Sequence, residues 1–247
     1  MSPPLWAKVF DTEANGDQMP QLSTTEGDRW WLPFLKKENN SFYLYSDNCQ
    51  KLEHHFEVLK ASNQSESKLS FTCEATNQCK EELNCRTPAP NFLKKVNVGS
   101  LLDDYVVKNH LRVQDGVNCW NNVLLFHGEV KKERFVSARE FHAFVTDRQK
   151  CQQVTSENEI RYGTVVAIRD KNELKFDPQG GGELHGFFLV TEDLVFSKNG
   201  PNATYPYELQ PIERIWATFS VPELCREFNV PESCRTYATY YNCKAED

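Results

Sequence analysis

The nine cysteines of this chain constrain its fold more than any other feature, because they fall into two kinds of surroundings. Eight lie in or between polar stretches of sequence: Cys49, Cys73, Cys79, Cys85, Cys151, Cys225, Cys234 and Cys243. We interpret these eight as disulfide partners, which favours a secreted or periplasmic protein. Their spacings of six and nine residues do not form the short chelating pairs of structural zinc sites. The sequence therefore predicts neither a metal site nor another cofactor.

The ninth cysteine, Cys119, is predicted to lie at the N-terminus of a helix. Asn118 can cap that helix, apolar positions such as Trp120 and Leu124 repeat with helical spacing, and Gly128 can end it. Backbone N–H groups and the helix dipole at such a position stabilise a thiolate. Two interpretations remain open: a reactive thiol, or a small buried residue on a core helix.

Composition excludes several classes of function. A chain of 247 residues with 39% hydrophobic and 12% aromatic residues is typical of one large globular domain or two small ones. The formal charge of -7, with no basic block longer than a pair, argues against nucleic acid as a partner. No apolar run is long enough to span a bilayer. The start of the sequence does not resemble a signal peptide, and we expect that one was removed and Met1 added.

A segment with two closely spaced prolines, residues 86–91, predicts a domain boundary. Residues 1–90 would form a small disulfide-containing accessory domain of unknown role. Residues 91–247 would form the main domain with a disulfide-bonded C-terminal extension.

The main domain reads as helices followed by strands. Ser100 with Asp103, and Ser137 with Glu140, fit the caps of two helices that flank the Cys119 helix. Strands are then predicted at residues 162–169, 173–176, 184–190, 194–197, 207–212 and 215–219. This order predicts an α+β fold with an antiparallel sheet.

His185 is the first plausible base after Cys119, at the start of a strand that follows a glycine loop. A thiol nucleophile needs an imidazole nearby, and a polar group to orient that imidazole. If residues 191–193 form a three-residue turn, Ser197 and Asn199 lie on the same sheet face as His185. A two-residue turn would place Lys198 there instead. The alternative is that His185 is an ordinary strand histidine.

Residues 96–220 resemble an NlpC-type papain-like cysteine peptidase. The resemblance rests on Asn-Cys-Trp at the start of a helix and on a sheet with His-Gly-Phe-Phe-Leu-Val followed by Leu-Val-Phe-Ser-Lys-Asn-Gly. It implies helices packed on an antiparallel sheet, with Cys119 as nucleophile and His185 as base. Ser197 stands where that family commonly has a histidine, and Asn199 is the other candidate for orienting the base. Asn118 and Trp120, beside the nucleophile, are the candidates for substrate binding.

The resemblance further implies hydrolysis of a peptide or amide bond in peptidoglycan stem peptides, through a thioester on Cys119. Two alternatives remain open. The thioester could pass to an amine or alcohol, which would make the protein an acyltransferase. The chain could instead be a catalytically silent secreted binding or adhesion module, in which Cys119 is bridged and His185 is structural.

Overall fold

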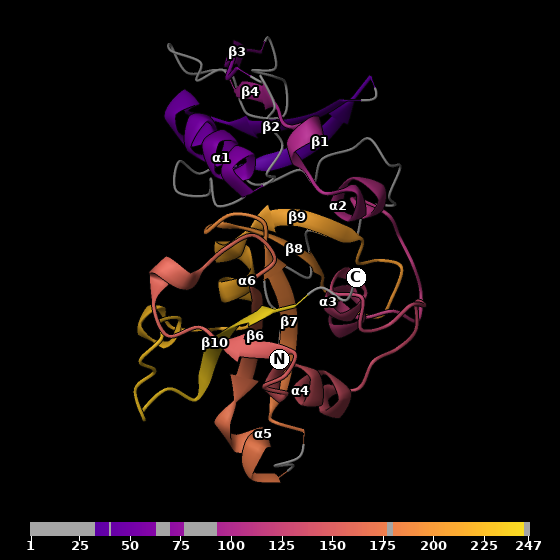
Figure 1. Ribbon diagram of the computed structural model, residues 1–247, viewed down its shortest axis with the longest axis vertical. Helices are drawn as coiled ribbons and strands as arrows, with labels where there is room; N and C mark the ends of the chain where they lie inside the picture. Colours follow the sequence, from indigo (N-terminus) through magenta and orange to yellow (C-terminus); the bar gives the residue numbers. More distant parts are fainter. Residues whose placement is uncertain (1–32, 40, 63–69, 77–92, 177–179, 245–247) are drawn as a thin grey trace, which may run out of the picture.

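The computed structural model describes residues 33–39, 41–62, 70–76, 93–176 and 180–244. Within them the chain is a mixed α and β protein with two antiparallel sheets (Figure 1). Cys79 and Cys85 lie outside these residues.

The N-terminal part forms a four-stranded sheet with one helix on it. Its strands are β1 (Phe34–Glu38), β2 (Ser41–Ser46), β4 (Lys94–Asn97) and β3 (Glu74–Ala75), in the order β1-β2-β4-β3. Helix α1 (Cys49–Ser62) buries Leu52, Phe56 and Leu59 beneath this sheet, and a disulfide joins Cys49 to Cys73. Strand β4 begins beyond the predicted boundary at residue 90, so residues from both sides of that boundary complete this sheet.

The C-terminal part is built on a six-stranded sheet in the order β5-β10-β6-β7-β8-β9. The strands are β5 (Cys151–Gln153), β6 (Val165–Asp170), β7 (Glu183–Leu189), β8 (Leu194–Lys198), β9 (Tyr207–Pro211) and β10 (Thr236–Cys243). The helices are α2 (Asp104–Asn109), α3 (Cys119–Phe126), α4 (Ala138–Thr146), α5 (Lys171–Phe176) and α6 (Ile212–Thr218). Short 3₁₀ turns lie at Gly99–Leu101, Glu157–Glu159 and Glu223–Cys225.

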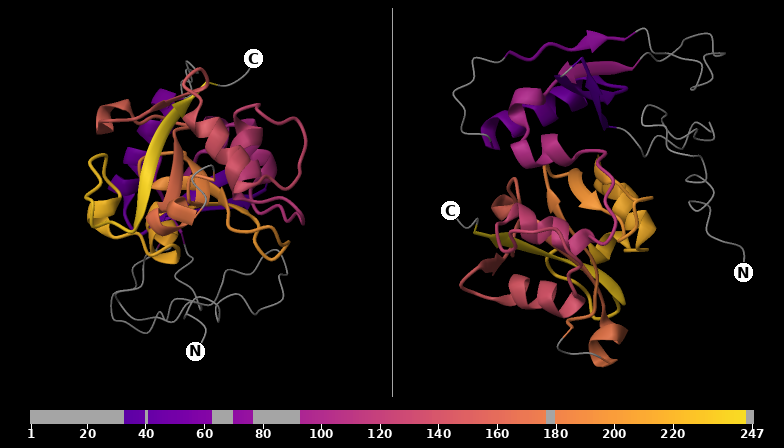
Figure 2. Two further views of the ribbon diagram at one scale, coloured as in Figure 1. Left: turned by 90° about the horizontal axis from the view of Figure 1, so that it is seen from below. Right: turned by 90° about the vertical axis from the view of Figure 1, so that its right-hand side faces the viewer.

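Helices cover both faces of this sheet (Figures 1 and 2). Neighbouring residues of a strand point to opposite faces. On β6, Val165 and Ala167 accordingly join the apolar cluster under α3 and α4. Val166 and Ile168 join the cluster under α6. The two faces are therefore distinct environments, and the position of each site residue depends on which face it occupies.

Two of the three predicted helix caps are confirmed. The Asn118 side chain accepts a hydrogen bond from the backbone N–H of Asn121, and Ser137 accepts one from Glu140. The cap predicted at Ser100 is wrong, because Asp103 accepts from the backbone N–H of Tyr105 and α2 begins after it.

Two predicted strands are helices instead. Residues 171–176 form α5, because the Asp170 carboxylate accepts the backbone N–H of Asn172 and starts a helical turn where a strand was expected to follow. Residues 212–218 form α6, which buries Ile212, Ile215 and Trp216 with helical spacing against the sheet.

The predicted three-residue turn between β7 and β8 is confirmed. Leu189 pairs with Val195, and the backbone N–H of Val190 donates to the carbonyl of Leu194 across residues 191–193. This register places Ser197 on the same face as His185.

The cysteine pattern agrees with expectation where the structure describes it. Disulfides join Cys49–Cys73, Cys151–Cys243 and Cys225–Cys234, and Cys119 is a buried free thiol. None of the described helices is long and apolar enough to cross a membrane.

Candidate functional site

The thiol of Cys119 lies at the first residue of α3, against strand β7. The residue is 7% exposed. Backbone N–H groups of Gly186, of Trp120 and of Cys119 itself are directed at the sulfur. The paired residues of β7 and β8 are Phe188↔Phe196 and Leu189↔Val195, so the ladder ends before Gly186. The N–H of Gly186 is therefore available to the sulfur.

Glycine at position 186 is what allows α3 to approach the strand so closely. A Cβ atom there would lie 2.7 Å from Cζ of Phe141 on α4 and 3.0 Å from Cδ1 of Trp120 on α3. Both distances are too short for a side chain without movement of its neighbours. Glycine inside a strand often marks such a close approach.

The protein holds the thiol of Cys119 in its protonated form at neutral pH. Burial raises the pKa of Cys119 to about 11. The three backbone N–H groups and the positive charge of Lys198 act in the opposite direction but do not outweigh the loss of hydration. In the absence of substrate the structure therefore holds a thiol and not a thiolate.

His185, Ser197 and Asn199 form one chain of hydrogen bonds. Nε2 of His185 lies 2.9 Å from Oγ of Ser197, and that hydroxyl donates to Oδ1 of Asn199 at 2.9 Å. Because Ser197 gives its only proton to Asn199, it accepts at His185, so the imidazole carries its proton on Nε2. Nδ1 then holds a lone pair and can act as a base. Of the two candidates for the orienting residue, Ser197 contacts the imidazole directly, and Asn199 acts on it through the hydroxyl of Ser197.

The imidazole of His185 is buried against aromatic rings. It is 1% exposed and stacks on Phe219, with ring centroids 4.4 Å apart and planes 17° apart. Burial lowers its pKa to about 3, so it is neutral at physiological pH. This surface belongs to the face of the sheet that α6 covers.

The thiol and the imidazole flank β7 from opposite sides. Gly186 faces Trp120 and Phe141, whereas His185, one residue earlier, faces Phe187 and Phe219. Among the described residues, no hydrogen bond joins the Cys119 sulfur to His185. The structure thus brings the two groups to adjacent residues of one strand without bringing them into contact.

The two substrate-binding candidates differ in their surroundings. Asn118 is buried, accepts the backbone N–H groups of Asn121 and Val136, and donates to the carbonyl of Val136 at 2.7 Å. Its amide thus holds the start of α3 in place. Trp120 is partly buried and stacks on Phe141, with ring centroids 6.1 Å apart.

Lys198 also lies in this region. With the three-residue turn, it is on the sheet face opposite to His185. Its side chain is fully buried, and Nζ donates to the carbonyls of Gly200, Asn202 and Tyr205. It therefore closes the loop that follows Asn199. The sequence signal for this role is a lysine at a position of β8 that faces the apolar interior. A polar residue at such a position needs internal hydrogen-bond partners.

Other candidate sites in the described part of the chain are weaker. No group of three or more His, Cys, Asp or Glu side chains there could hold a metal ion. An open cavity of about 550 Å³ lies among Asp170, Ser220, Arg235 and the Cys225–Cys234 disulfide, and neither Cys119 nor His185 lines it.

No family model, curated protein or solved structure matches this chain.

Proposed function

We propose that the chain is a papain-like thiol hydrolase of the NlpC type, with Cys119 as nucleophile and His185 as base. One observation carries the proposal. The free cysteine of the described region, Cys119, is the first residue of a helix that packs against Gly186. The residue next to Gly186 is His185, which Ser197 and Asn199 orient. A helix packed on an antiparallel sheet, with this order of residues along the chain, also supports the papain-like assignment.

The proposed reaction transfers an acyl group to sulfur. The sulfur of Cys119 attacks the carbonyl carbon, and the thiol proton passes to Nδ1 of His185. The leaving amine then takes that proton, and water later releases the acyl group from the thioester. Because the two side chains flank β7 from opposite sides, the proposal requires them to meet in the substrate complex, at the gap where the β7–β8 ladder ends.

The proposed substrate is a peptide, with peptidoglycan stem peptides as the expected class because of the family resemblance. Three disulfides are typical of proteins from oxidising compartments, which is consistent with a periplasmic or secreted enzyme. The N-terminal sheet would then act as an accessory element that limits access to the site.

A secreted binding module is the second candidate function. The raised pKa of Cys119 and the absence of a hydrogen bond from its sulfur to His185 favour it. An acyltransferase would share every step of the hydrolase mechanism up to the thioester, and would differ in the acceptor alone.

Digestion of purified peptidoglycan, followed by mass spectrometry of the released peptides, tests the proposal. We expect new peptide ends with the native protein and none with Cys119→Ser or His185→Gln. Transfer products that appear only when an amine is added would identify an acyltransferase. If peptidoglycan is bound but not cut, and iodoacetamide does not alkylate native Cys119, the binding module is the correct function.

A further inference from the structure

The indole N–H of Trp120 is a buried donor without an acceptor. Nε1 is shielded from solvent and has no hydrogen-bond partner among the described residues. A buried N–H group left in this way destabilises a protein by about 1–3 kcal/mol, so native structures keep few of them. The position of this one, next to Cys119 in the first turn of α3, suggests a use in binding.

The indole is held close to the point where the thiol meets β7. Its Cδ1 atom, which is bonded to Nε1, lies 3.0 Å from the position of a Cβ atom on Gly186. The backbone N–H of the same Gly186 is directed at the Cys119 sulfur. Stacking on Phe141, with planes 20° apart, fixes the orientation of the ring. The indole of Trp120 and the Cys119 sulfur therefore both lie against Gly186.

The side-chain donors of Lys198, Asn122 and Asn118 near this region are already engaged. Lys198 directs its three N–H groups at three backbone carbonyls. The Asn122 amide donates to the carbonyl of Phe196, and the amide of Asn118 donates to Val136. Trp120 is thus the side chain here whose donor has no acceptor within the described structure.

We propose that Trp120 is a catalytic residue whose indole N–H binds the acyl oxygen of the substrate, an inference that rests on the proposed thiol chemistry. When sulfur forms its bond to the carbonyl carbon, the π electrons move to oxygen and the thiol proton moves to His185. The indole N–H, together with the N–H of Gly186, binds that oxyanion. Collapse of the intermediate re-forms the C=O bond, expels the leaving group with its bonding electrons, and leaves a thioester on Cys119.

The test separates acylation from simple alkylation of the same sulfur. p-Nitrophenyl acetate acylates a cysteine through an oxyanion and releases a coloured phenolate, whereas iodoacetamide alkylates it by displacement without one. We expect Trp120→Phe to slow acylation about 100-fold, the usual loss when one oxyanion donor is removed. Alkylation of Cys119 should keep its native rate. Incorporation of benzothienylalanine at position 120, which keeps the ring shape and lacks the N–H, should give the same result if the phenylalanine variant unfolds.

Trp216→Phe is the matched control, because Trp216 is buried under the other face of the sheet. It should acylate at the native rate. Native acylation rates in both Trp120 variants would overturn the role of the indole while leaving thiol chemistry intact. If the unmodified protein is alkylated but never acylated, the proposed function fails, and the inference fails with it. Equal slowing of acylation and alkylation would show that Trp120 only shapes the site and would also overturn the inference.

Discussion

Glu183 and Arg169 form a buried ion pair at the start of β7, two residues before His185. Nε of Arg169 donates to Oε1 of Glu183 at 2.8 Å, and Nδ1 of His142 lies 2.8 Å from the same oxygen. The backbone of Gly181 lies so close that a Cβ there would be 1.8 Å from His142 and 2.2 Å from Glu183. This network fixes the end of the strand that carries His185.

The Glu183→Gln variant should be strongly destabilised. The amide is nearly the same size, but it leaves the Arg169 guanidinium buried without its counter-charge, which typically lowers the free energy of unfolding by about 3–5 kcal/mol. Urea unfolding measures the loss. Glu232→Gln, at an exposed glutamate near Lys171, is the control and should unfold at the same urea concentration as the native protein. Equal midpoints for the two variants would contradict this account.

Two buried histidines should make the protein less stable in mild acid. Burial lowers the pKa of His185 to about 3 and that of His127 to about 4, whereas an unfolded histidine titrates near pH 6.5. Between these values the unfolded chain binds protons that the folded chain does not. The free energy of unfolding is therefore highest above about pH 6.5 and falls by up to about 1.4 kcal/mol per pH unit for each histidine as the pH drops.

Urea unfolding at about pH 7.5, 6 and 5 checks this dependence. His127 is the better of the two histidines to replace, since the one hydrogen bond of its imidazole to a described residue goes to the carbonyl of Gly163. His127→Gln should reduce the slope of stability against pH by up to about 1.4 kcal/mol per pH unit between pH 6 and 5. The rest of the slope should remain, because burial also lowers the pKa of His185, His55 and His110. A slope as steep as that of the native protein would mean that His127 is not responsible.

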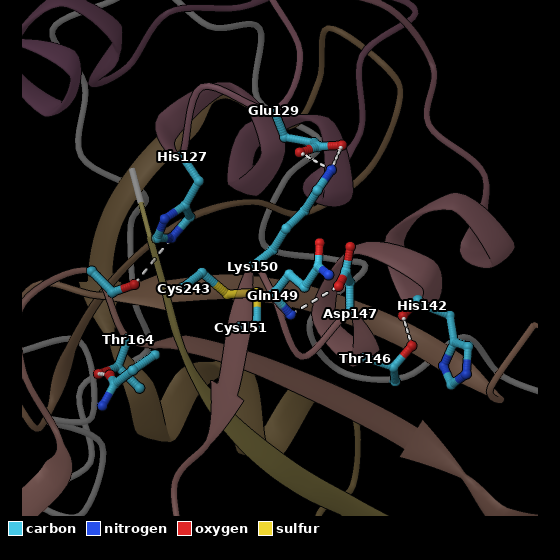
Figure 3. The surroundings of a disulfide bond; sticks show 12 residues. His127, Glu129, His142, Thr146, Asp147, Gln149, Lys150, Cys151, Thr164 and Cys243 are labelled. Carbon is cyan, nitrogen blue, oxygen red and sulfur yellow. Dashed lines mark hydrogen bonds and ion pairs between the residues drawn. A yellow bond between two sulfur atoms is a disulfide. The ribbon is translucent and has the colours of Figure 1, made fainter. Parts of the chain in front are cut away.

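At the scale of the elements, two disulfides differ in how many residues they enclose, and this number affects how much each one stabilises the protein. Cys151–Cys243 joins β5 to β10 across 92 residues, beside the pair of Lys150 and Glu129 (Figure 3). Cys225–Cys234 closes a loop of 9 residues. In the chain-entropy account, a longer closed loop restricts the unfolded chain more.

Removal of each disulfide tests this account. Replacing Cys151 and Cys243 by alanine should lower the free energy of unfolding by about 2 kcal/mol more than the same change at Cys225 and Cys234, from the logarithm of the loop lengths. Calorimetric or urea unfolding of both double variants measures the difference. A larger loss from the short loop would show that packing around the sulfur atoms, and not chain entropy, dominates.

The sequence predicted elements well where local signals and tertiary packing agree. Side-chain caps at Asn118 and Ser137 are such signals, and so is the turn at residues 191–193. The predicted strand at 215–219 failed because short apolar runs do not distinguish a strand from a helix. In α6 the helix is stabilised by burial of Ile215 and Trp216 against the sheet, which no local pattern reveals.

The candidate site was predictable only in part, for a geometric reason. Alternation along a strand and one turn length were enough to place Ser197 and Asn199 with His185. The face on which α3 packs depends on contacts between residues far apart in sequence. That contact places Cys119 against Gly186, and hence on the other side of β7 from the imidazole.

Over the whole molecule, the two sheets share one apolar core. Leu44, Phe56 and Val96 of the N-terminal part belong to the same cluster as Phe188 and Phe196 of the C-terminal sheet. His110 adds a polar link: Nε2 donates to the carbonyl of Leu35, and Nδ1 accepts the backbone N–H of Leu209, each at 3.2 Å. The described residues before position 90 are thus joined to the C-terminal sheet by packing and a hydrogen bond.

This shared core predicts that residues 91–247 do not fold independently. Their expression alone would expose Phe188 and Phe196 to water and leave β4 without β2. Each large apolar side chain exposed in this way forfeits about 1.5–3 kcal/mol, so a few of them exceed the stability of a typical domain. We expect the fragment to lack sharp near-ultraviolet circular dichroism and to bind a hydrophobic dye. The full chain should unfold in one transition by fluorescence and circular dichroism alike. A folded fragment, or two separate transitions, would instead mean that the cluster joins two independent domains, as the proline-rich segment suggested.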